Sequence, residues 1–410
     1  MANKFLEKFD TFTLVVAVLI VSVGLVAIYS ATFSSEIDSD LFYKQLYFSV
    51  IGLAIMIGVS YLPPRYLSNI SYMIYIFSLI LLVLVLIFGK SISGSKSWFS
   101  IGGFGLQPSE FTKIATVLAL SKFLTSEDKE RNINKPLDFI KACGIVLIPV
   151  ALIMKQPDLG TSIVFLSMLL PIFFWAGLSP FVLFTIISPI VISLIALFLG
   201  DYYFYAALLL VLIVLILFKR KVYLLIIVFL INVAAGISVE KLFNALQPYQ
   251  QNRIMNVFDP TTDPLGSGYN VIQSKVAIGS GGLLGKGYLQ GTQTQLKFIP
   301  EQWTDFIFCM IGEEFGFIGA ALLVILYIIL IIQFINNAYI SKNKFLGLSC
   351  IGIASIMMFH LVINVGMTVG IMPVIGIPLP LVSYGVSSLL SFMIMIGIGM
   401  NTYRNRKIFT

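Results

Sequence analysis

The chain has 410 residues, of which 58% are hydrophobic and only 11% are charged, with a net charge of +7 at pH 7 and a mean hydropathy of +0.98. Because soluble domains carry about a quarter charged residues, this composition excludes an ordinary soluble protein and predicts an all-α polytopic membrane protein. The basic residues cluster in short loops on one side of the expected helices, which is the positive-inside pattern of membrane proteins and argues against nucleic acid as a partner.

The apolar runs are continuous, unlike the alternating pattern of a membrane β-barrel, and many approach the ~20 residues that cross a bilayer. We expect twelve spans, and we expect the first to be an uncleaved helix because it is longer than the apolar core of a signal peptide. The spans are expected at about 11–31, 44–62, 70–89, from Pro108 to Ser126, and at about 139–154, 159–177, 180–200, 203–218, 222–239, 303–336, 345–368 and 381–401. The tenth is too long for one simple span, so we expect a break between Gly312 and Gly319.

The basic triplet Lys219–Arg220–Lys221 marks the inner side of the membrane. It therefore places the long polar segment at about 240–302 outside, and twelve spans leave both termini in the cytoplasm. We expect a single integral membrane domain over residues 1–410, with no separate soluble domain. A loop as long as 240–302 indicates a functional or partner-binding role.

Three carboxylates stand at the start of the tenth span, where charged groups are costly and are functional candidates by default. Asp305 lies at the outer end among aromatic and aliphatic neighbours, and partial desolvation suits a carboxylate to act as a general base. The alternative is a helix N-cap formed by Thr304 or Asp305, and the residues alone leave both open. Glu313 and Glu314 are adjacent and point about 100° apart on a helix, so structural pairing is favoured for at least one of them.

A second polar cluster opens the fourth span. Glu110 and Lys113 are three residues apart and can interact on one helix face. They form either a local salt bridge or, with Gln107 and Ser109, the polar wall of a cavity. We predict that removing either charge of the pair lowers activity more than folding. Asp158 is expected to cap the sixth span or to help close the outer side of the cavity.

Several basic residues lie in the outer segment against the positive-inside trend. These residues predict an anionic ligand such as a phosphate, although some of them are expected to contact only lipid headgroups. They are Lys241, Arg253, Lys275, Lys286 and Lys297. The run GGLLGKG lacks the spacing and the Ser or Thr of a nucleotide-binding loop, and we interpret it as a mobile loop with tight turns. His360 is the only histidine and lies one turn before Asn364, so a buried polar contact is expected rather than a metal site.

Five long motifs, in order along nearly the whole chain except about 180–239, resemble the SEDS family of bacteria (shape, elongation, division and sporulation). The motifs are GSKSWFSIGGFGLQPSE, KQPDLGTS, QNRIMNVFDPTTDPLGSGYNVIQSKVAIGSGGLLGKG, TQLKFIPEQWTDFIFCMIGEEFG and MPVIGIPLPLVSYG. The segment GTQTQLKFIPE is more similar to the rod-shape branch of the family, RodA, than to the division branch, FtsW.

The resemblance implies a peptidoglycan glycosyltransferase, a hexosyltransferase that polymerises lipid II into β-1,4-linked glycan strands on the outer face of the bacterial cytoplasmic (inner) membrane during elongation and shape maintenance. It implies that Asp305 is the family's essential aspartate and that Glu110 and Lys113 are the polar pair of its central cavity. The substrate-binding candidates are Glu110, Lys113, Arg253, Lys275, Lys286, Trp98 and Lys96. The structural or cavity-lining candidates are Gln107, Ser109, Asp158, Glu313, Glu314, Asn364 and Ser383.

The resemblance also implies partners. These are lipid II, a glycan linked to undecaprenyl pyrophosphate, membrane lipids and a class B penicillin-binding protein. A divalent cation (Mg²⁺ or Mn²⁺) can assist the leaving group, but the sequence shows no dedicated set of metal ligands.

The span count departs from the family pattern, which generally has ten spans. The two additional helices fall at about 180–239, and adding a pair keeps Asp305 outside. Three other functions remain open at this point: a lipid II flippase or transporter, the division-type polymerase, and a non-enzymatic scaffold for wall synthesis.

Overall fold

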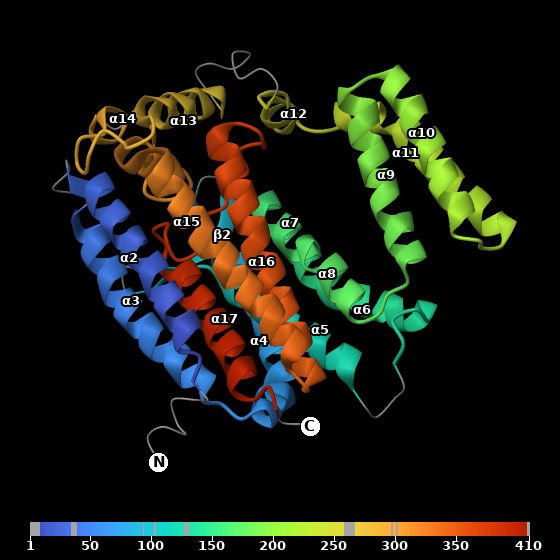
Figure 1. Cartoon of the computed structure of the whole chain (residues 1–410), viewed down its shortest axis with the longest axis horizontal. Coiled ribbons are helices and arrows are strands. Elements are labelled where there is room, and N and C mark those ends of the chain that lie inside the picture. The colour runs from blue at the N-terminus through green and yellow to red at the C-terminus, as the bar shows by residue number, and fades with distance from the viewer. Residues whose placement is uncertain are drawn as a thin grey trace. The chain divides into compact units, whose positions relative to one another are not determined.

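The computed structural model describes residues 9–33, 39–92, 94–101, 104–126, 131–257, 267–296, 298–300 and 302–407. These residues are mainly helical (Figure 1). Their contacts divide the chain into two compact units, which we call the main unit (Met1–Ala176 and Asn256–Thr410) and the inserted unit (Gly177–Met255).

Nine helices among the described residues are long and apolar enough to cross a membrane, which makes the chain a multi-pass membrane protein. They are α2 (Thr11–Phe33), α3 (Ser39–Ser60), α4 (Pro64–Phe88), α6 (Pro136–Met154), α9 (Pro180–Phe198), α11 (Val222–Asn244), α15 (Ile307–Ile340), α16 (Lys344–Val369) and α17 (Val386–Arg404). Shorter apolar helices are α7 (Leu159–Ser167) with α8 (Leu169–Trp175), and α10 (Asp201–Leu217). Helix α5 (Pro108–Thr125) has 18 residues but carries three charges. The expected total of twelve spans therefore stays a prediction.

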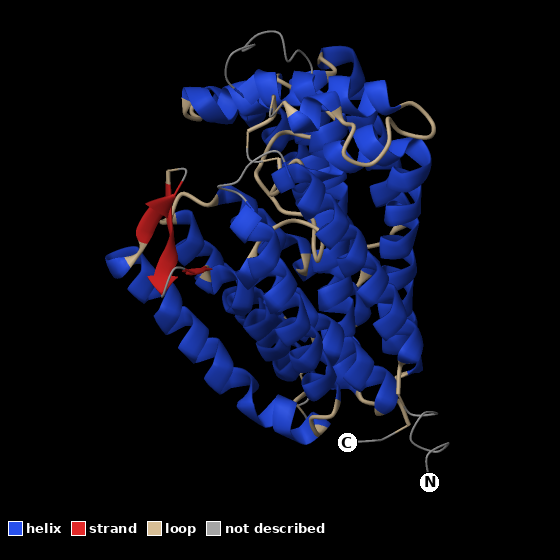
Figure 2. Cartoon of the chain, turned by 90° about the vertical axis from the view of Figure 1, so that its left-hand side faces the viewer, coloured by secondary structure: helices blue, strands red, loops and turns tan. Residues whose placement is uncertain are grey.

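The segment before α5 contains a small antiparallel sheet that the sequence pattern did not predict. Its strands are β1 (Lys90–Ile92), β2 (Ser95–Ile101) and β3 (Phe104–Leu106), in the order β1-β2-β3 (Figure 2). Trp98 of β2 packs on Gly105 of β3, where an added Cβ would lie 3.0 Å from the indole ring. The sheet leads into α5, which begins at Pro108, a favourable residue for the first helical position.

The inserted unit contains three helices in the ranges where three apolar runs were expected between about 180 and 239. Helix α9 packs against α10 and α11. Their shared apolar core consists of Ile192, Phe204, Leu208, Val211, Leu215 and Val228. Gly236 of α11 permits the close approach of α10, since a Cβ there would overlap the ring of Phe204.

The range 240–302 is more helical than a polar loop. Helix α11 continues to Asn244, and the range also contains α12 (Pro248–Met255), α13 (Ser267–Gly281) and α14 (Thr292–Gln295). Residues 258–266, 297 and 301 lie outside the described part of the chain. These helices are short or polar, so they lack the long apolar pattern that identified the spans.

Helix α15 breaks at Gly316, whose φ of 66° and ψ of −166° lie outside the helical region. The break predicted between Gly312 and Gly319 is thereby confirmed. The glycine-rich segment 281–287 pairs with the broken turn through four backbone hydrogen bonds. They run from Phe317 N to Gly282 O (2.9 Å), Ile318 N to Leu283 O (3.1 Å), Lys286 N to Glu313 O (3.0 Å) and Gly287 N to Glu314 O (3.1 Å).

These four bonds replace the two that the break removes. In an unbroken helix the N–H groups of residues 317 and 318 would donate to the carbonyls of residues 313 and 314. Backbone polar groups at membrane depth need such partners. Glycine is required on both sides of the junction, because a Cβ at Gly316 would overlap Gly285 N and a Cβ at Gly285 would overlap Glu314 O. The glycine run therefore has the tight turns that we expected, with positive φ at Gly282, Gly285 and Gly287, and it is tied to α15.

The first and last helices of the main unit meet at one end. Asp10 caps α2 by accepting a hydrogen bond from Thr13 N at 3.1 Å, and it also accepts one from Asn337 Nδ2 of α15 at 3.4 Å. Asn337 Nδ2 donates a second bond to Gly399 O of α17 at 3.4 Å. The start of α2 and the end of α17 consequently lie on the same side of the main unit (Figure 1).

Candidate active site

Asp305 lies in a turn that immediately precedes α15 and is half-buried. The N-cap position of α15 is Phe306, so neither Thr304 nor Asp305 occupies it. The carboxylate faces Gly376 in the segment between α16 and α17, where an added Cβ would be 3.2 Å from Asp305 Oδ2. Gly376 has a φ of 75°, a left-handed conformation that favours glycine.

Two side chains attach the Asp305 turn to the segment that follows α16. Asn364 Nδ2 donates to the backbone carbonyl of Asp305 at 2.9 Å and to that of Ile377 at 2.8 Å. Ser383 Oγ donates to Thr304 O at 2.6 Å and accepts from Leu379 N at 2.8 Å. Both polar side chains are buried, Asn364 completely, and together they fix the backbone on which the Asp305 carboxylate stands.

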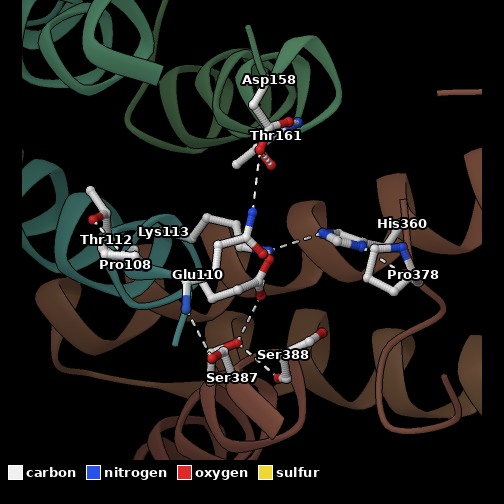
Figure 3. Close-up of polar contacts among 12 residues, drawn as sticks. Pro108, Glu110, Thr112, Lys113, Asp158, Thr161, His360, Pro378, Ser387 and Ser388 are labelled. Carbon is white, nitrogen blue, oxygen red and sulfur yellow. Dashed lines mark hydrogen bonds and ion pairs between the residues drawn. The ribbon is translucent and has the colours of Figure 1, made fainter. Parts of the chain in front are cut away.

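A buried ion pair joins Glu110 and Lys113 on α5 (Figure 3). Lys113 Nζ lies 2.9 Å from Glu110 Oε2, and the side chains are 1% and 5% exposed. Glu110 Oε2 also accepts a hydrogen bond from Ser391 Oγ of α17 at 3.1 Å. The salt bridge, one of the two alternatives for this pair, is present, and it lies among α5, α16 and α17 rather than on an open surface.

The ion pair continues to His360 on α16. Lys113 Nζ lies 3.2 Å from His360 Nε2, and His360 Nδ1 lies 3.0 Å from Pro378 O (Figure 3). Because a lysine ammonium can only donate, Nε2 accepts from Lys113. Nδ1 then carries the proton and donates to the carbonyl of Pro378. His360 is thus a neutral, buried histidine with two polar contacts, as predicted.

Gln107, at the N-cap of α5, connects α5 with α17 and α7. Its backbone N–H donates to Ser387 Oγ at 3.0 Å, and its Nε2 donates to Asp158 Oδ2 at 3.2 Å. Asp158 caps α7, as expected, through Thr161 N at 3.0 Å (Figure 3). Burial raises the pKa of the Asp158 carboxyl above its ordinary value. Ser109 is buried, and its hydroxyl has no hydrogen-bond partner among the described residues.

The Glu313 carboxylate is held by a lysine and by hydrogen-bond donors of the protein. It is fully buried and lies 2.8 Å from Lys286 Nζ. It also accepts from the backbone N–H groups of Gln293 and Thr294 at 2.9 Å and 3.0 Å, and from the Thr294 hydroxyl at 2.8 Å. Lys286, which we expected to bind an anionic substrate, therefore neutralises a carboxylate of the protein in this structure.

Glu314 points to a different element. Its Oε1 accepts from Ser30 Oγ of α2 at 2.6 Å, whereas Oε2 is buried and has no partner among the described residues. The predicted divergence of Glu313 and Glu314 is confirmed.

The remaining candidates lie in separate environments. Lys275 of α13 lies over Gly370, the C-cap of α16, where a Cβ would overlap its Cε, and positive charge is favourable at a helix C-terminus. Lys96 Nζ donates to Ile87 O, near the end of α4, at 2.9 Å. Arg253 is exposed on α12 of the inserted unit. Among the described residues, no group of three His, Cys, Asp or Glu is placed to hold a metal ion.

Sequence reasoning missed how His360, Asn364 and Ser383 act together. They contact three successive residues of one segment, namely Pro378, Ile377 and Leu379. The four-residue spacing of His360 and Asn364 puts them on one helix face, and that spacing was the available signal.

Comparisons with known proteins find matches over nearly the whole chain. The family model for FtsW, RodA and SpoVE, described as "Cell cycle protein", matches residues 10–206 and 199–408. The chain is 34% identical over 425 residues to the peptidoglycan glycosyltransferase RodA of Treponema pallidum, covering 96% of this chain and 97% of the relative. It is 36% identical over 377 residues to the peptidoglycan glycosyltransferase MrdB of Escherichia coli, covering 91% and 88%.

A solved structure shows the same fold. The chain superimposes with a TM-score of 0.72 and 28% identity on a chain from a structure described as "Structural coordination of polymerization and crosslinking by a peptidoglycan synthase complex", covering 97% of this chain and 98% of that one.

Proposed function

Since the chain belongs to the FtsW/RodA/SpoVE family, we propose that it is a peptidoglycan glycosyltransferase of the elongation type, which polymerises lipid II into glycan strands. The acceptor is the 4-hydroxyl of the N-acetylglucosamine of an incoming lipid II. The donor is the growing glycan, linked through its anomeric carbon to undecaprenyl pyrophosphate. The acceptor oxygen forms a bond to that carbon, the carbon–oxygen bond to pyrophosphate breaks, and inversion gives a β-1,4 link.

Asp305 is the proposed general base of this reaction. It takes the proton of the acceptor hydroxyl as the oxygen attacks, so the carboxylate is protonated while the negative charge leaves on pyrophosphate. The observation that carries the proposal is a half-buried carboxylate outside the N-cap position, on a turn whose backbone two buried side chains hold. A general base needs such fixed placement because small displacements of the reacting groups are costly.

The Glu110–Lys113 pair supports this site indirectly, through His360. Lys113 donates to His360, which donates to Pro378 two residues from Gly376. We propose that the pair holds α5 against α16 and α17. We also propose that Glu110 or Lys113 contacts lipid II when the protein adopts a more open conformation. A buried pair is costly to break, so it suits a supporting role.

Basic groups are needed where charge develops on the leaving pyrophosphate. Lys275 and Lys286 remain the candidates within the main unit, together with Lys96 and Trp98 as substrate contacts. Arg253 of the inserted unit stays a separate proposed substrate contact. Lys286 is one quarter exposed even while it pairs with Glu313. A divalent cation (Mg²⁺ or Mn²⁺) stays a proposed aid to the leaving pyrophosphate, although no group of three His, Cys, Asp or Glu among the described residues is placed to hold one.

We further propose a class B penicillin-binding protein as the partner, which would crosslink the glycan. The relative in a solved peptidoglycan synthase complex supports this proposal. The proposed location is the bacterial inner membrane, with both termini in the cytoplasm and Asp305 on the outer face, as the positive-inside pattern favours.

Purified protein, with and without its class B partner, tests the activity on labelled lipid II. The proposal expects polymeric glycan from the wild-type protein and none from Asp305→Ala. Translocation of lipid II across vesicles without any polymer, even with the partner present, would instead establish a transporter.

A further inference from the structure

The Asp305 turn is held by a side-chain amide from the C-terminal part of a different helix. Asn364 of α16 is fully buried, and its Nδ2 donates to Asp305 O at 2.9 Å and to Ile377 O at 2.8 Å. Two carbonyl acceptors require that the amide nitrogen face them both. The amide oxygen accepts no hydrogen bond from a described residue, so the polar contacts of Asn364 within the described chain run through its nitrogen.

The second acceptor gives these contacts their meaning. Ile377 follows Gly376, the residue that faces the Asp305 carboxylate. One amide group thus holds both the backbone of Asp305 and the backbone of the segment that the carboxylate faces. Changing either bond would alter the separation between Asp305 and the surface that the carboxylate faces.

The same segment is anchored at the two following residues. His360 donates to Pro378 O at 3.0 Å, and Ser383 accepts from Leu379 N at 2.8 Å while it donates to Thr304 O at 2.6 Å. Only Asn364 and Ser383 among these three hold both sides of the site. Ser383 supports Thr304, and Asn364 supports Asp305 itself.

We propose that Asn364 is a positioning residue for the glycosyl transfer, with Ser383 as its second support, and that both set the orientation of the Asp305 carboxylate without touching substrate. This inference rests on the proposed polymerase function. Losing the amide removes the hydrogen bonds that Asn364 donates to the carbonyls of Asp305 and Ile377 and lets the turn shift. A displacement of about 1 Å can cost about a hundredfold in rate, so the effect falls on turnover rather than on lipid II binding.

The experiment compares Asn364→Ala with Asn401→Ala in the full-length protein together with its class B partner. Asn401 is a matched control, because it is also fully buried and its Nδ2 donates to the carbonyls of Val59, Ser60 and Leu62. Polymerisation of labelled lipid II gives kcat and KM, and thermal unfolding in detergent measures stability. We expect Asn364→Ala to lower kcat about tenfold to a hundredfold with KM changed less than about twofold. Asn401→Ala should lower the unfolding temperature and leave kcat unchanged.

Ser383→Ala decides the matter if Asn364→Ala does not accumulate as folded protein. This variant removes a single oxygen and should also lower kcat, whereas Ser71→Ala should not, because the buried Ser71 hydroxyl donates only within its own helix, to Leu67 O. A wild-type kcat in a folded Asn364→Ala variant, or an equal loss of kcat in Asn401→Ala, would overturn the inference. An inactive wild-type protein would overturn the proposed function instead.

Discussion

Removing the Glu313 carboxylate should release the loop that contains α14. Glu313 is buried and accepts from Gln293 N at 2.9 Å and from Thr294 N at 3.0 Å. A hydrogen bond to a charged group contributes about 1.5–3 kcal/mol. Because every 1.4 kcal/mol corresponds to about a factor of ten, Glu313→Ala should speed the exchange of each of these two amide hydrogens roughly tenfold to a hundredfold.

Hydrogen exchange followed by mass spectrometry on the peptide that spans 291–296 measures this effect. Lys286→Met should cause a smaller increase, since Glu313 keeps its bonds to Gln293 and Thr294. Asp158→Ala is the matched control, because the Asp158 carboxylate also accepts from a backbone N–H group, but that group belongs to Thr161 of α7. Unchanged exchange in Glu313→Ala would refute the structural role assigned to this carboxylate.

Three further perturbations have directions that follow from the structure. Gly316→Ala should strongly lower the unfolding temperature, because its φ is positive and the Cβ would overlap Gly285 N, whereas Gly58→Ala in α3 meets no atom and should be neutral or slightly stabilising. Because the pair is buried, Lys113→Met should affect folding more than the sequence alone led us to expect, and it should cost about 3–5 kcal/mol of unfolding free energy by leaving Glu110 buried and unpaired. Adding Glu110→Gln should restore part of that free energy, as denaturant titration can measure. Because the pKa of the Asp158 carboxyl is raised, the folded state binds a proton there more tightly than the unfolded state does. The folded protein therefore loses stability as pH rises from 3.8 to the raised pKa. Asp158→Asn should remove that slope in a thermal-unfolding series over pH and still cap α7.

The sequence was sufficient for features that depend on local pattern. Continuous apolar runs predicted the long helices, and glycine spacing with excess length predicted the break at Gly316. Helical geometry predicted that Glu313 and Glu314 diverge, and the i, i+3 spacing predicted the Glu110–Lys113 pair.

The remaining features depend on contacts between residues far apart in the chain. Asn364 lies 59 residues from the turn that it holds, and no local pattern specifies that partner. The glycine run was interpreted as a mobile loop because no local pattern shows its hydrogen-bond partners. Those partners are on the broken turn of α15. The strands β1 and β3 have three residues each and are too short to show alternation, and the polar helices near α13 carry no long apolar pattern.

The basic residues show the same limit for function. Charge and side of the membrane selected Lys286 as an anion-binding candidate, but charge alone could not reveal that Glu313 neutralises it in the folded protein. Lys275 likewise lies against the C-terminus of α16. Side-chain partners, and not composition, decide which positive charges are available to a substrate.

Polymerisation of labelled lipid II by the purified protein with its class B partner, compared between wild type and Asp305→Asn, tests the central assignment most directly. Asparagine keeps the shape of the side chain and removes the proton acceptor. The general-base assignment predicts polymer from the wild type and none from a folded Asp305→Asn protein, with thermal unfolding of both proteins close to equal. Polymer formation at the wild-type rate by Asp305→Asn would contradict it.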